Sequence, residues 1–453
     1  MLQRSRAGRQ GAWRAFVGAV AVAGAMAWAV PTAAQQEPAD DDEAAEASAA
    51  AQEEPLGDET ANESAHTDFP ALFVGFETEP AMDYGGRVVA SAHDAVAASF
   101  ARIGDVGERH PGLAPVWEFP TAAALLLVEH EVLGHGARAR EFGLSPSYGF
   151  GLDFSGSTGT ERPPRDHTEL QLLAAGGAEA DGVMAHRLLL DALGEGGIDG
   201  AQLPLLMMAK LDLTVYVASA PRPRPGDGEG DFTDEYRNGN DVAIYLVGRQ
   251  AARLGAPAAS VWDGVYEPDF EERRLEDDWK QARQAALWNL LDPSLVAAMT
   301  GYFRQHVLHG SARVQAPALR LGESARLTLG TRAALGPEDI SRFLDVVAAL
   351  PWGVVDVYLR DIDSGVDSSW GYGAAVHAAR FGPLSLSLAA DGWEEPDGTT
   401  GAGESRWNAV AEGEWRGERW GVALKVGNKS EGFFPGLPID EGVYAGAGVI
   451  VDW

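Results

Sequence analysis

The sequence predicts an α+β protein, in which a helical domain is followed by an antiparallel, eight-stranded β-barrel. Three observations predict this fold class. Apolar runs of helical length dominate from residue 68 to residue 310, and from residue 311 onward apolar and polar residues alternate with a period of two. The connections between the predicted strands also alternate between long and short, as they do in barrels that span an outer membrane.

Residues 1–34 have the pattern of a secretory signal peptide. Several arginines precede an apolar run over residues 15–30, and Pro31-Thr32-Ala33-Ala34 follows that run. A retained membrane anchor is the alternative, but the run is shorter than the roughly 20 residues that a spanning helix needs. Residues 35–67 are rich in Asp and Glu and contain no Lys or Arg, which is typical of a disordered acidic linker. We therefore expect an exported protein.

The overall charge excludes one class of partner. The chain has 67 Asp and Glu residues against 35 Lys and Arg residues, a formal net charge of −32. A nucleic-acid-binding protein needs a basic face, so no nucleic-acid partner is expected. The chain has no cysteine, which excludes a disulfide scaffold, a thiolate metal site and a cysteine nucleophile.

In the helical domain, residues 68–310, proline and glycine residues mark where the predicted helices begin and end. One apolar stretch opens at Pro120, continues to Phe142 and stops at Gly143, which predicts a single helix. Residues 221–240 are rich in proline and glycine and predict a long loop or lid. Further helices are predicted at 168–193, 201–218, 240–254, 271–290 and 293–308.

The predicted helix over 120–142 contains a motif of metal-binding character, H-E-x-x-x-H. Neutral imidazoles such as those of His130 and His135 suit Zn²⁺, and the carboxylate of Glu131 can take a proton from a metal-bound water. On an ideal α-helix this spacing separates the two histidines by roughly 140°, because successive residues differ by about 100°. One widened turn of the π type would bring them together, and Gly134 lowers the cost of that distortion.

The run HEVLGHG, which ends at Gly136, resembles the H-E-L-L-G-H zinc motif of the dipeptidyl-peptidase III family of metallopeptidases. The resemblance implies that His130 and His135 bind zinc and that Glu131 is the general base. It also implies that a glutamate on a later helix is the third ligand, within a helical, zincin-like domain. The resemblance is confined to this run, so the exopeptidase specificity of the family is not implied.

The favoured third ligand is Glu179. The small residues of Ala174–Ala178 precede it and would let two helices approach closely enough to share a metal. The E-A-D string is similar to the third-ligand helix of several glutamate-type zincins, which leaves Asp181 as an alternative. Asp181 lies about 200° from Glu179 around a helix, so it is expected either to face solvent or to orient a histidine ring by accepting its other N–H. His186 is a further candidate ligand, although a capped or solvent-exposed histidine is the commoner reading.

The C-terminal region, residues 311–453, is predicted to be the barrel. Trp407 and Trp415 close the two ends of one apolar face, as interfacial aromatic girdles do, and the chain ends on Trp453. These features resemble outer-membrane barrels; a soluble sandwich or barrel is the alternative. A helix-like segment at 336–350 interrupts the pattern. Strands are predicted at 312–320, 324–335, 351–360, 369–380, 383–393, 405–416, 418–428 and 442–453.

Together these patterns predict a cell-envelope, zinc-dependent metallohydrolase that acts as a peptidase on peptide or protein substrates. The helical domain would lie in the periplasm, next to a barrel in the outer membrane. One alternative is an outer-membrane structural or transport protein with a non-catalytic metal site, and a weaker one is a soluble periplasmic binding protein. An open coordination position beside a cleft would favour the enzyme.

Overall fold

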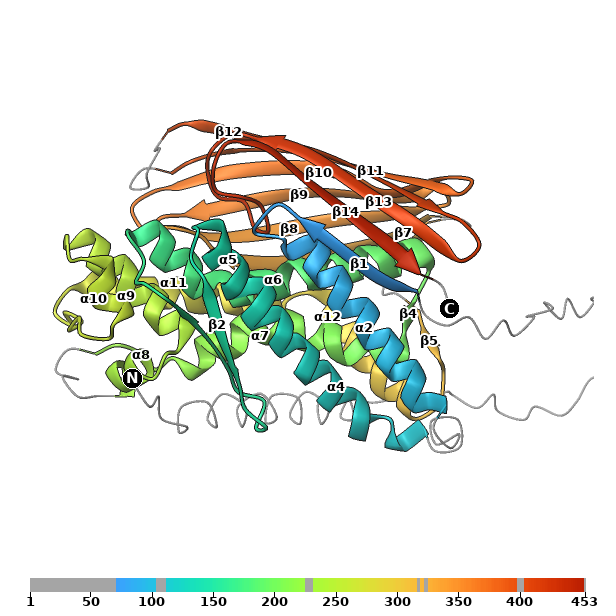
Figure 1. The fold of residues 1–453 in the computed structure, drawn as a ribbon, viewed down its shortest axis with the longest axis horizontal. Helices are drawn as coiled ribbons and strands as arrows, with labels where there is room; N and C mark the ends of the chain where they lie inside the picture. The colour runs from blue at the N-terminus through green and yellow to red at the C-terminus, as the bar shows by residue number, and fades with distance from the viewer. Residues whose placement is uncertain are drawn as a thin grey trace, which may run out of the picture.

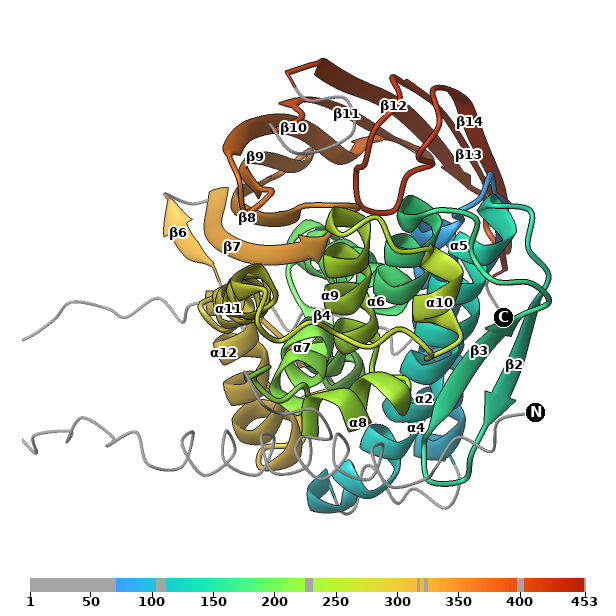
Figure 2. The same ribbon diagram turned by 90° about the vertical axis from the view of Figure 1, so that its left-hand side faces the viewer.

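The chain folds into a layer of helices covered by one curved antiparallel sheet (Figures 1 and 2). The computed structural model describes residues 71–102, 111–224, 231–315, 318–321, 325–396 and 403–451. The predicted signal peptide, the predicted acidic linker and Trp453 lie outside these residues. The fold is therefore α+β, as expected.

The sheet has ten strands and is open, so the expectation of a closed, eight-stranded barrel is wrong. The strand order is β1-β14-β13-β12-β11-β10-β9-β8-β7-β6, which leaves β1 and β6 as edges. Alternating apolar and polar residues predict a sheet with two different faces, and a closed barrel or an open sheet satisfies that pattern equally well. Here the concave face meets helices instead of enclosing a lumen (Figure 2).

The strand boundaries agree closely with the alternation in the sequence. The segments predicted at 405–416 and 442–453, for example, form β12 and β14. The strands are β1 (Leu72–Glu77), β6 (Leu319–Leu321), β7 (Ala325–Leu335), β8 (Ile340–Leu350), β9 (Gly353–Asp363), β10 (Ser368–Phe381), β11 (Leu384–Glu394), β12 (Ser405–Arg416), β13 (Trp420–Lys429) and β14 (Gly442–Val451).

Three segments differ from the sequence expectation. In place of the strand predicted at 312–320, the structure has two short strands, β5 (Arg313–Val314) and β6, which belong to different sheets. The helix-like segment at 336–350 forms β8, which pairs with β7 and with β9. Its two faces both carry apolar side chains, Phe343 and Val347 toward the helices and Leu344 and Val346 outward, which hides the period of two. Strand β1 comes from the predicted helical region, yet it pairs with β14 at the end of the chain.

The helical layer contains the predicted helices and three that the sequence did not indicate. The predicted loop at 221–240 includes the short helix α8, and α2 and α10 were also not predicted. The helices are α2 (Met82–Arg102), α4 (Pro115–Val128), α5 (Gly136–Glu141), α6 (His167–Glu195), α7 (Leu203–Ser219), α8 (Asp231–Arg237), α9 (Asp241–Arg253), α10 (Ala258–Trp262), α11 (Arg273–Leu290) and α12 (Pro293–Thr300). A two-stranded hairpin, β2 (Pro146–Phe150) and β3 (Gly156–Thr160), joins α5 to α6.

Helices α6 and α7 lie at the centre of the helical layer. Residues 172 and 173 of α6 and residues 205–209 of α7 are buried on nearly all sides, so these helices form the core against which the others pack. Among the described residues, the segment Gly200–Ser219 is long and apolar enough to cross a membrane, but 56% of it is buried inside the protein. Core helices of that composition pass the same test.

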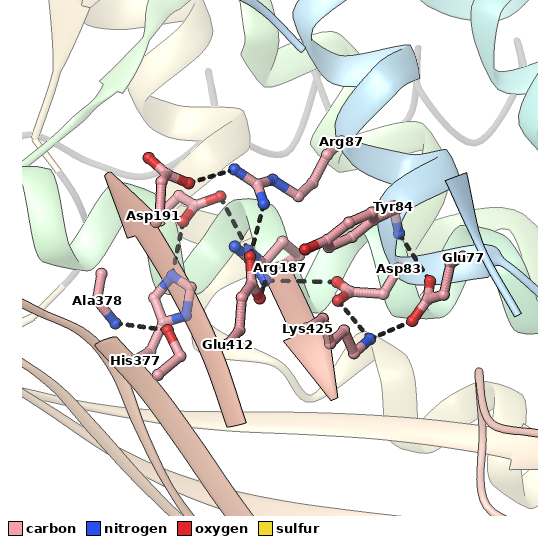
Figure 3. Close-up of polar contacts among 12 residues, drawn as sticks. Glu77, Asp83, Tyr84, Arg87, Arg187, Asp191, His377, Ala378, Glu412 and Lys425 are labelled. Atoms are coloured by element: carbon pink, nitrogen blue, oxygen red, sulfur yellow. Dashed lines mark hydrogen bonds and ion pairs between the residues drawn. The ribbon is translucent and has the colours of Figure 1, made fainter. Parts of the chain in front are cut away.

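The two layers meet through buried ion pairs as well as through apolar contacts (Figure 3). Lys425 on β13 pairs with Glu77 and, at 2.9 Å, with Asp83 on α2. Arg87 on α2 and Arg187 on α6 both pair with Glu412 on β12, at 2.7 and 3.3 Å. The concave face of the sheet thus contributes buried charged side chains, as well as apolar ones, to its contact with the helices.

Candidate metal centre

The H-E-x-x-x-H motif lies on a π-helical turn, as the sequence predicted. Helix α4 continues without a break into this turn, η2 (Glu129–His135), and then into α5. The wider turn brings the two histidines to the same side, with His130 Nε2 and His135 Nε2 3.1 Å apart. Both side chains are buried, with relative exposures of 3% and 7%.

The outer nitrogen of each imidazole is held by an acceptor. His130 Nδ1–H donates to Asp181 Oδ2 at 3.0 Å, and His135 Nδ1–H donates to the Leu173 carbonyl at 2.5 Å. A carboxylate and a carbonyl can only accept, so each ring carries a proton on Nδ1 and turns its Nε2 toward the other histidine and Asp241. Asp181 therefore has the supporting role expected from its place on the helix.

Close packing between η2 and α6 makes this arrangement possible. A Cβ atom added at Gly134 would lie 2.6 Å from the Gly176 carbonyl oxygen, and one added at Gly177 would lie 2.3 Å from His130 Nε2. Only glycine fits at these positions, because real Cβ atoms do not approach other heavy atoms so closely. The small residues before position 179 thus bring the helices together, as predicted.

The third group at the histidine pair is Asp241. Its Oδ2 atom lies 3.2 Å from His130 Nε2 and 3.3 Å from His135 Nε2. Asp241 is the first residue of α9, and the side chain of Asn240 caps this helix by accepting from the Ala243 amide at 2.9 Å. Burial alone would raise the pKa of Asp241, but the two histidines lower it below its usual value. The carboxylate is therefore charged.

The structure does not bring Glu179, the predicted third ligand, to the histidines. Glu179 points to the other side of α6, where Arg138 Nε donates to its Oε2 at 3.0 Å and the Gly436 amide donates to its Oε1 at 2.7 Å. Arg138 forms a second, short hydrogen bond to the same carboxylate. With Asp181 turned to His130, Glu179 must point elsewhere, because the two lie on opposite sides of the helix.

Glu131, the predicted catalytic base, lies beside the histidine pair in the same cavity. Its Oε2 accepts a hydrogen bond from Thr158 Oγ1 at 2.8 Å, on strand β3. Gly156 on the same strand leaves room for it, since a Cβ there would lie 2.2 Å from Glu131 Oε1. The carboxylate is thus oriented by the hairpin and is not one of the three converging donors.

A cavity of about 200 Å³ opens next to these residues. Tyr216 on α7 stacks on the His130 ring, with centroids 5.0 Å apart and planes at 7°. Burial raises the pKa of Tyr216 well above its usual value, so its hydroxyl stays protonated. Asp212, one turn earlier, places Oδ2 3.4 Å from His130 Nδ1. Apolar side chains complete the walls, among them Leu126, Leu127, Phe154, Met208, Val215, Ile244 and Trp262.

Two other residues, the candidate His186 on α6 and Glu129 at the start of η2, do not reach the site. His186 Nε2 lies 3.1 Å from Asp356 Oδ2 on β9, and together with Asp345 these residues form a separate His/Asp group. Arg332 pairs with Asp345 at 3.2 Å, which already compensates charge in that group. Glu129 is fully buried, and burial followed by the nearby Asp181 raises its pKa well above the usual range.

The buried His/Asp group could hold a metal ion. Three donor atoms, one each from His130, His135 and Asp241, lie within 3.1–3.3 Å of one another. Bond lengths of about 2.0–2.2 Å in a tetrahedral zinc site place neighbouring donors about 3.3–3.5 Å apart, so the residues present fit such an ion. Comparisons with protein-family models, with curated proteins and with solved structures found no match.

Proposed function

We propose that the protein is a zinc-dependent hydrolase that acts as a peptidase. The observation that carries this proposal is the convergence of His130 Nε2, His135 Nε2 and Asp241 Oδ2 within 3.1–3.3 Å, beside a free carboxylate and a cavity. Two imidazoles and one carboxylate are a donor set that catalytic zinc sites use. The resemblance of the HEVLGHG run to a metallopeptidase motif supports the same roles for the two histidines and Glu131.

An enzyme fits this arrangement better than a structural metal site does. Structural zinc sites have four protein ligands, whereas catalytic sites have three and leave the fourth position to water or substrate. Here three donors converge, and the residues that carry them also line the cavity of about 200 Å³. The remaining position would therefore face a space that a small part of a substrate can enter.

Three residues of the chain would take part in hydrolysis, namely Glu131, Thr158 and Tyr216. Bound zinc would act as a Lewis acid that polarises the scissile carbonyl and lowers the pKa of water. Glu131 would accept the proton of the attacking water and pass it to the leaving group, while Thr158 keeps its carboxylate in place. The protonated hydroxyl of Tyr216 is available to donate a hydrogen bond to the oxygen on which negative charge develops.

A strand edge beside the site supports a peptide as substrate. Strand β3 pairs with β2 on one side and has no second partner among the described strands. Its residues Gly156, Ser157 and Thr158 line the cavity next to Glu131. An extended peptide could add to this edge through main-chain hydrogen bonds, with its scissile bond near the metal. The signal-peptide pattern of residues 1–34 supports action in the cell envelope.

The proposal is tested by Glu131→Gln. This variant should keep the zinc of the wild type, because Glu131 is not a donor to the metal, and should hydrolyse peptides about 10²–10⁴-fold more slowly. The assay follows a defined peptide mixture by mass spectrometry, and zinc is measured by elemental analysis. Glu195→Gln changes an exposed glutamate at the end of α6 and should leave both quantities unchanged.

Two outcomes would contradict the proposal. If the zinc-loaded wild type cleaves no peptide in the mixture, the site is structural and the protein is not a peptidase. If Glu131→Gln cleaves as fast as the wild type, the glutamate is not the base.

A further inference from the structure

The ten-stranded sheet buries charged as well as apolar side chains on its concave face and exposes apolar side chains on its convex face. On the concave face, Lys425 and Glu412 are buried against α2 and α6, beside apolar residues such as Val347 (Figure 3). On its convex face, apolar side chains are exposed: Leu424 is 63% exposed, and Val357 is 49% exposed. Exposed apolar patches of this extent on a soluble protein mark an interaction surface.

The apolar residues form a continuous band across β8 to β14. Outward positions of these strands carry no charged side chain in the middle of the sheet. Small residues, including Ala374, Ala390 and Ala409, line an open apolar hollow of about 640 Å³ at the centre of the band. The band also contains Leu344, Val346, Val355, Leu359, Val376, Leu388, Ala411, Val422, Val426, Ala445, Ala447 and Val449.

Exposed aromatic side chains border the band at both ends of the strands. At one end, Tyr372 on β10 and Trp407 on β12 both lie opposite Gly392 of β11, so they are in one row across the sheet. At the other end, Phe381 and Trp415 both lie opposite Leu384. Trp352, Trp370 and Trp420 extend the two rims and are 46%, 62% and 54% exposed.

The separation of the rims matches the length of a strand that crosses a hydrocarbon layer. Trp407 and Trp415 end one strand face of nine residues, about 26 Å along the strand at about 3.3 Å per residue. A strand tilted by about 45° needs about 9–11 residues to cross a membrane. The apolar band of outer-membrane proteins is about 25 Å tall and is flanked by aromatic girdles at both interfaces. A protein partner would not require aromatic rows at this spacing.

Charged residues are sorted between the two ends of the strands. Beyond the rim that contains Trp415, exposed Arg380, Arg416 and Arg419 lie next to the short turns, together with exposed Glu418 and with Glu414, which pairs with Arg416. Beyond the opposite rim the side chains are mainly acidic, including Asp361, Asp363, Asp367, Glu394, Glu404 and Glu441. A row of arginines beside aromatic residues complements the anionic headgroups of phospholipids.

We propose that the convex face of the sheet, between the two aromatic rims, binds the hydrocarbon region of a lipid membrane. The helical layer, with the candidate metal centre, would then be held beside the membrane. The band that meets lipid is formed by β8 to β14, which all have a strand on each side, although β1 covers β14 only from Gly446 to Val451. The edge strands β1 and β6 are six and three residues long, and α2 packs along β1, which limits the unpaired backbone that lipid would meet.

A single fluorescent label tests contact with lipid. Because the chain has no cysteine, Leu424→Cys gives one labelling site at the centre of the band, and Leu254→Cys gives a matched site, 51% exposed, on the helical layer. The labelled full chain is reconstituted with phosphatidylcholine vesicles that contain acyl-chain nitroxides. We expect the label at position 424 to shift its emission to the blue and to be quenched, and the label at position 254 to do neither.

A second pair of variants measures how much the band contributes to binding. Leu424→Asp combined with Val357→Asp should reduce the fraction of protein that floats with the vesicles about tenfold or more, because charge on a lipid-facing strand is costly. Leu254→Asp should leave flotation unchanged. Thermal unfolding and zinc content show that each variant is folded, and both readouts are independent of membrane binding.

The arginine rim predicts a preference for anionic lipid. Adding phosphatidylglycerol to the vesicles should strengthen binding, and Arg419→Gln should reduce that gain about fivefold, the usual effect of one basic side chain near the membrane surface. Equal labelling results at positions 424 and 254 would overturn the proposal. So would a blue shift at position 424 that appears without vesicles and rises with protein concentration, which would identify a second copy of the chain as the occupant.

Discussion

Each metal-facing imidazole is fixed through its other nitrogen, one by Asp181 and one by the Leu173 carbonyl. Such outer contacts set the tautomer and the ring orientation, and their loss typically weakens metal binding 10- to 100-fold. Asp181→Asn should therefore lower the zinc affinity of the protein by about 10–100-fold, because an amide stabilises the Nδ1–H group less than a carboxylate does. Competition with a fluorescent zinc chelator measures the affinity.

Glu179 provides the control for that prediction, because it lies two residues away on the same helix. Glu179→Gln disturbs the pair with Arg138, so it should reduce the free energy of unfolding without changing zinc affinity. Equal losses of zinc affinity in both variants would mean that Asp181 acts only through the stability of α6.

The residues of the motif could be identified from the sequence, whereas Asp241 could not. His130, Glu131 and His135 interrupt an apolar run, and their spacing resembles that of a zinc-binding motif. Asp241 is more than 100 residues beyond His135 and follows a segment rich in proline and glycine. Nothing local distinguishes it from any acidic residue at the start of a helix, where such residues are common. Only the packing of α9 against α6 brings it to the histidines.

At the scale of elements, the π-helical turn and α6 act as one unit. The turn reorients the histidines, and the glycines of α6 provide the space that their rings need. The sequence predicted the turn because an α-helical H-E-x-x-x-H would place its histidines apart. It did not indicate that Gly134 also serves the contact with Gly176, since that contact joins segments 42 positions apart.

Gly134→Ala tests this contact. The added Cβ would lie 2.6 Å from the Gly176 carbonyl oxygen, so the two segments must separate. Overpacking of this kind should reduce the free energy of unfolding by about 1–3 kcal/mol and weaken zinc binding. Gly182→Ala is the control, because nothing lies within 4 Å of its Cβ position, and it should stabilise α6 by about 0.5–1 kcal/mol. Urea unfolding measures the change in unfolding free energy for each variant. A Gly134→Ala protein as stable as the wild type would show that the two segments are not closely packed at this contact.

At the scale of the whole molecule, buried charges join the sheet to the helices. Burial lowers the pKa of Lys425, but Asp83 and Glu77 raise it above its usual value, so the ammonium group stays charged. Lys425→Met would leave the buried Glu77 carboxylate without its cation and Asp83 with only its longer pair to Arg187, and should cost about 3–5 kcal/mol of unfolding free energy.

Lys280 is the matched control for that prediction, because it pairs with acidic residues on the solvent-exposed surface of α11. Lys280→Met should leave the unfolding transition nearly unchanged. Equal stability of the two variants in thermal unfolding would show that the layers do not depend on the buried pair.

The same charged interface explains why closure of the sheet could not be predicted. Inward positions such as Glu412 and Lys425 are polar, as they would be in a barrel with a water-filled interior. In the structure they meet Arg87, Arg187 and Asp83 on the helices instead. The sequence pattern indicates that one face of the sheet carries polar residues. It does not indicate what covers them, because the helical residues that pair with them lie more than 200 positions away in the chain.

The central claim is that His130, His135 and Asp241 bind one zinc ion. The measurement that tests it most directly is anomalous X-ray diffraction at the zinc edge from crystals of the zinc-loaded protein. We expect one anomalous peak at about 2.0–2.2 Å from His130 Nε2, His135 Nε2 and an oxygen of Asp241. A peak bound by Glu179, or a zinc-loaded protein with no peak at the two histidines, would contradict the account.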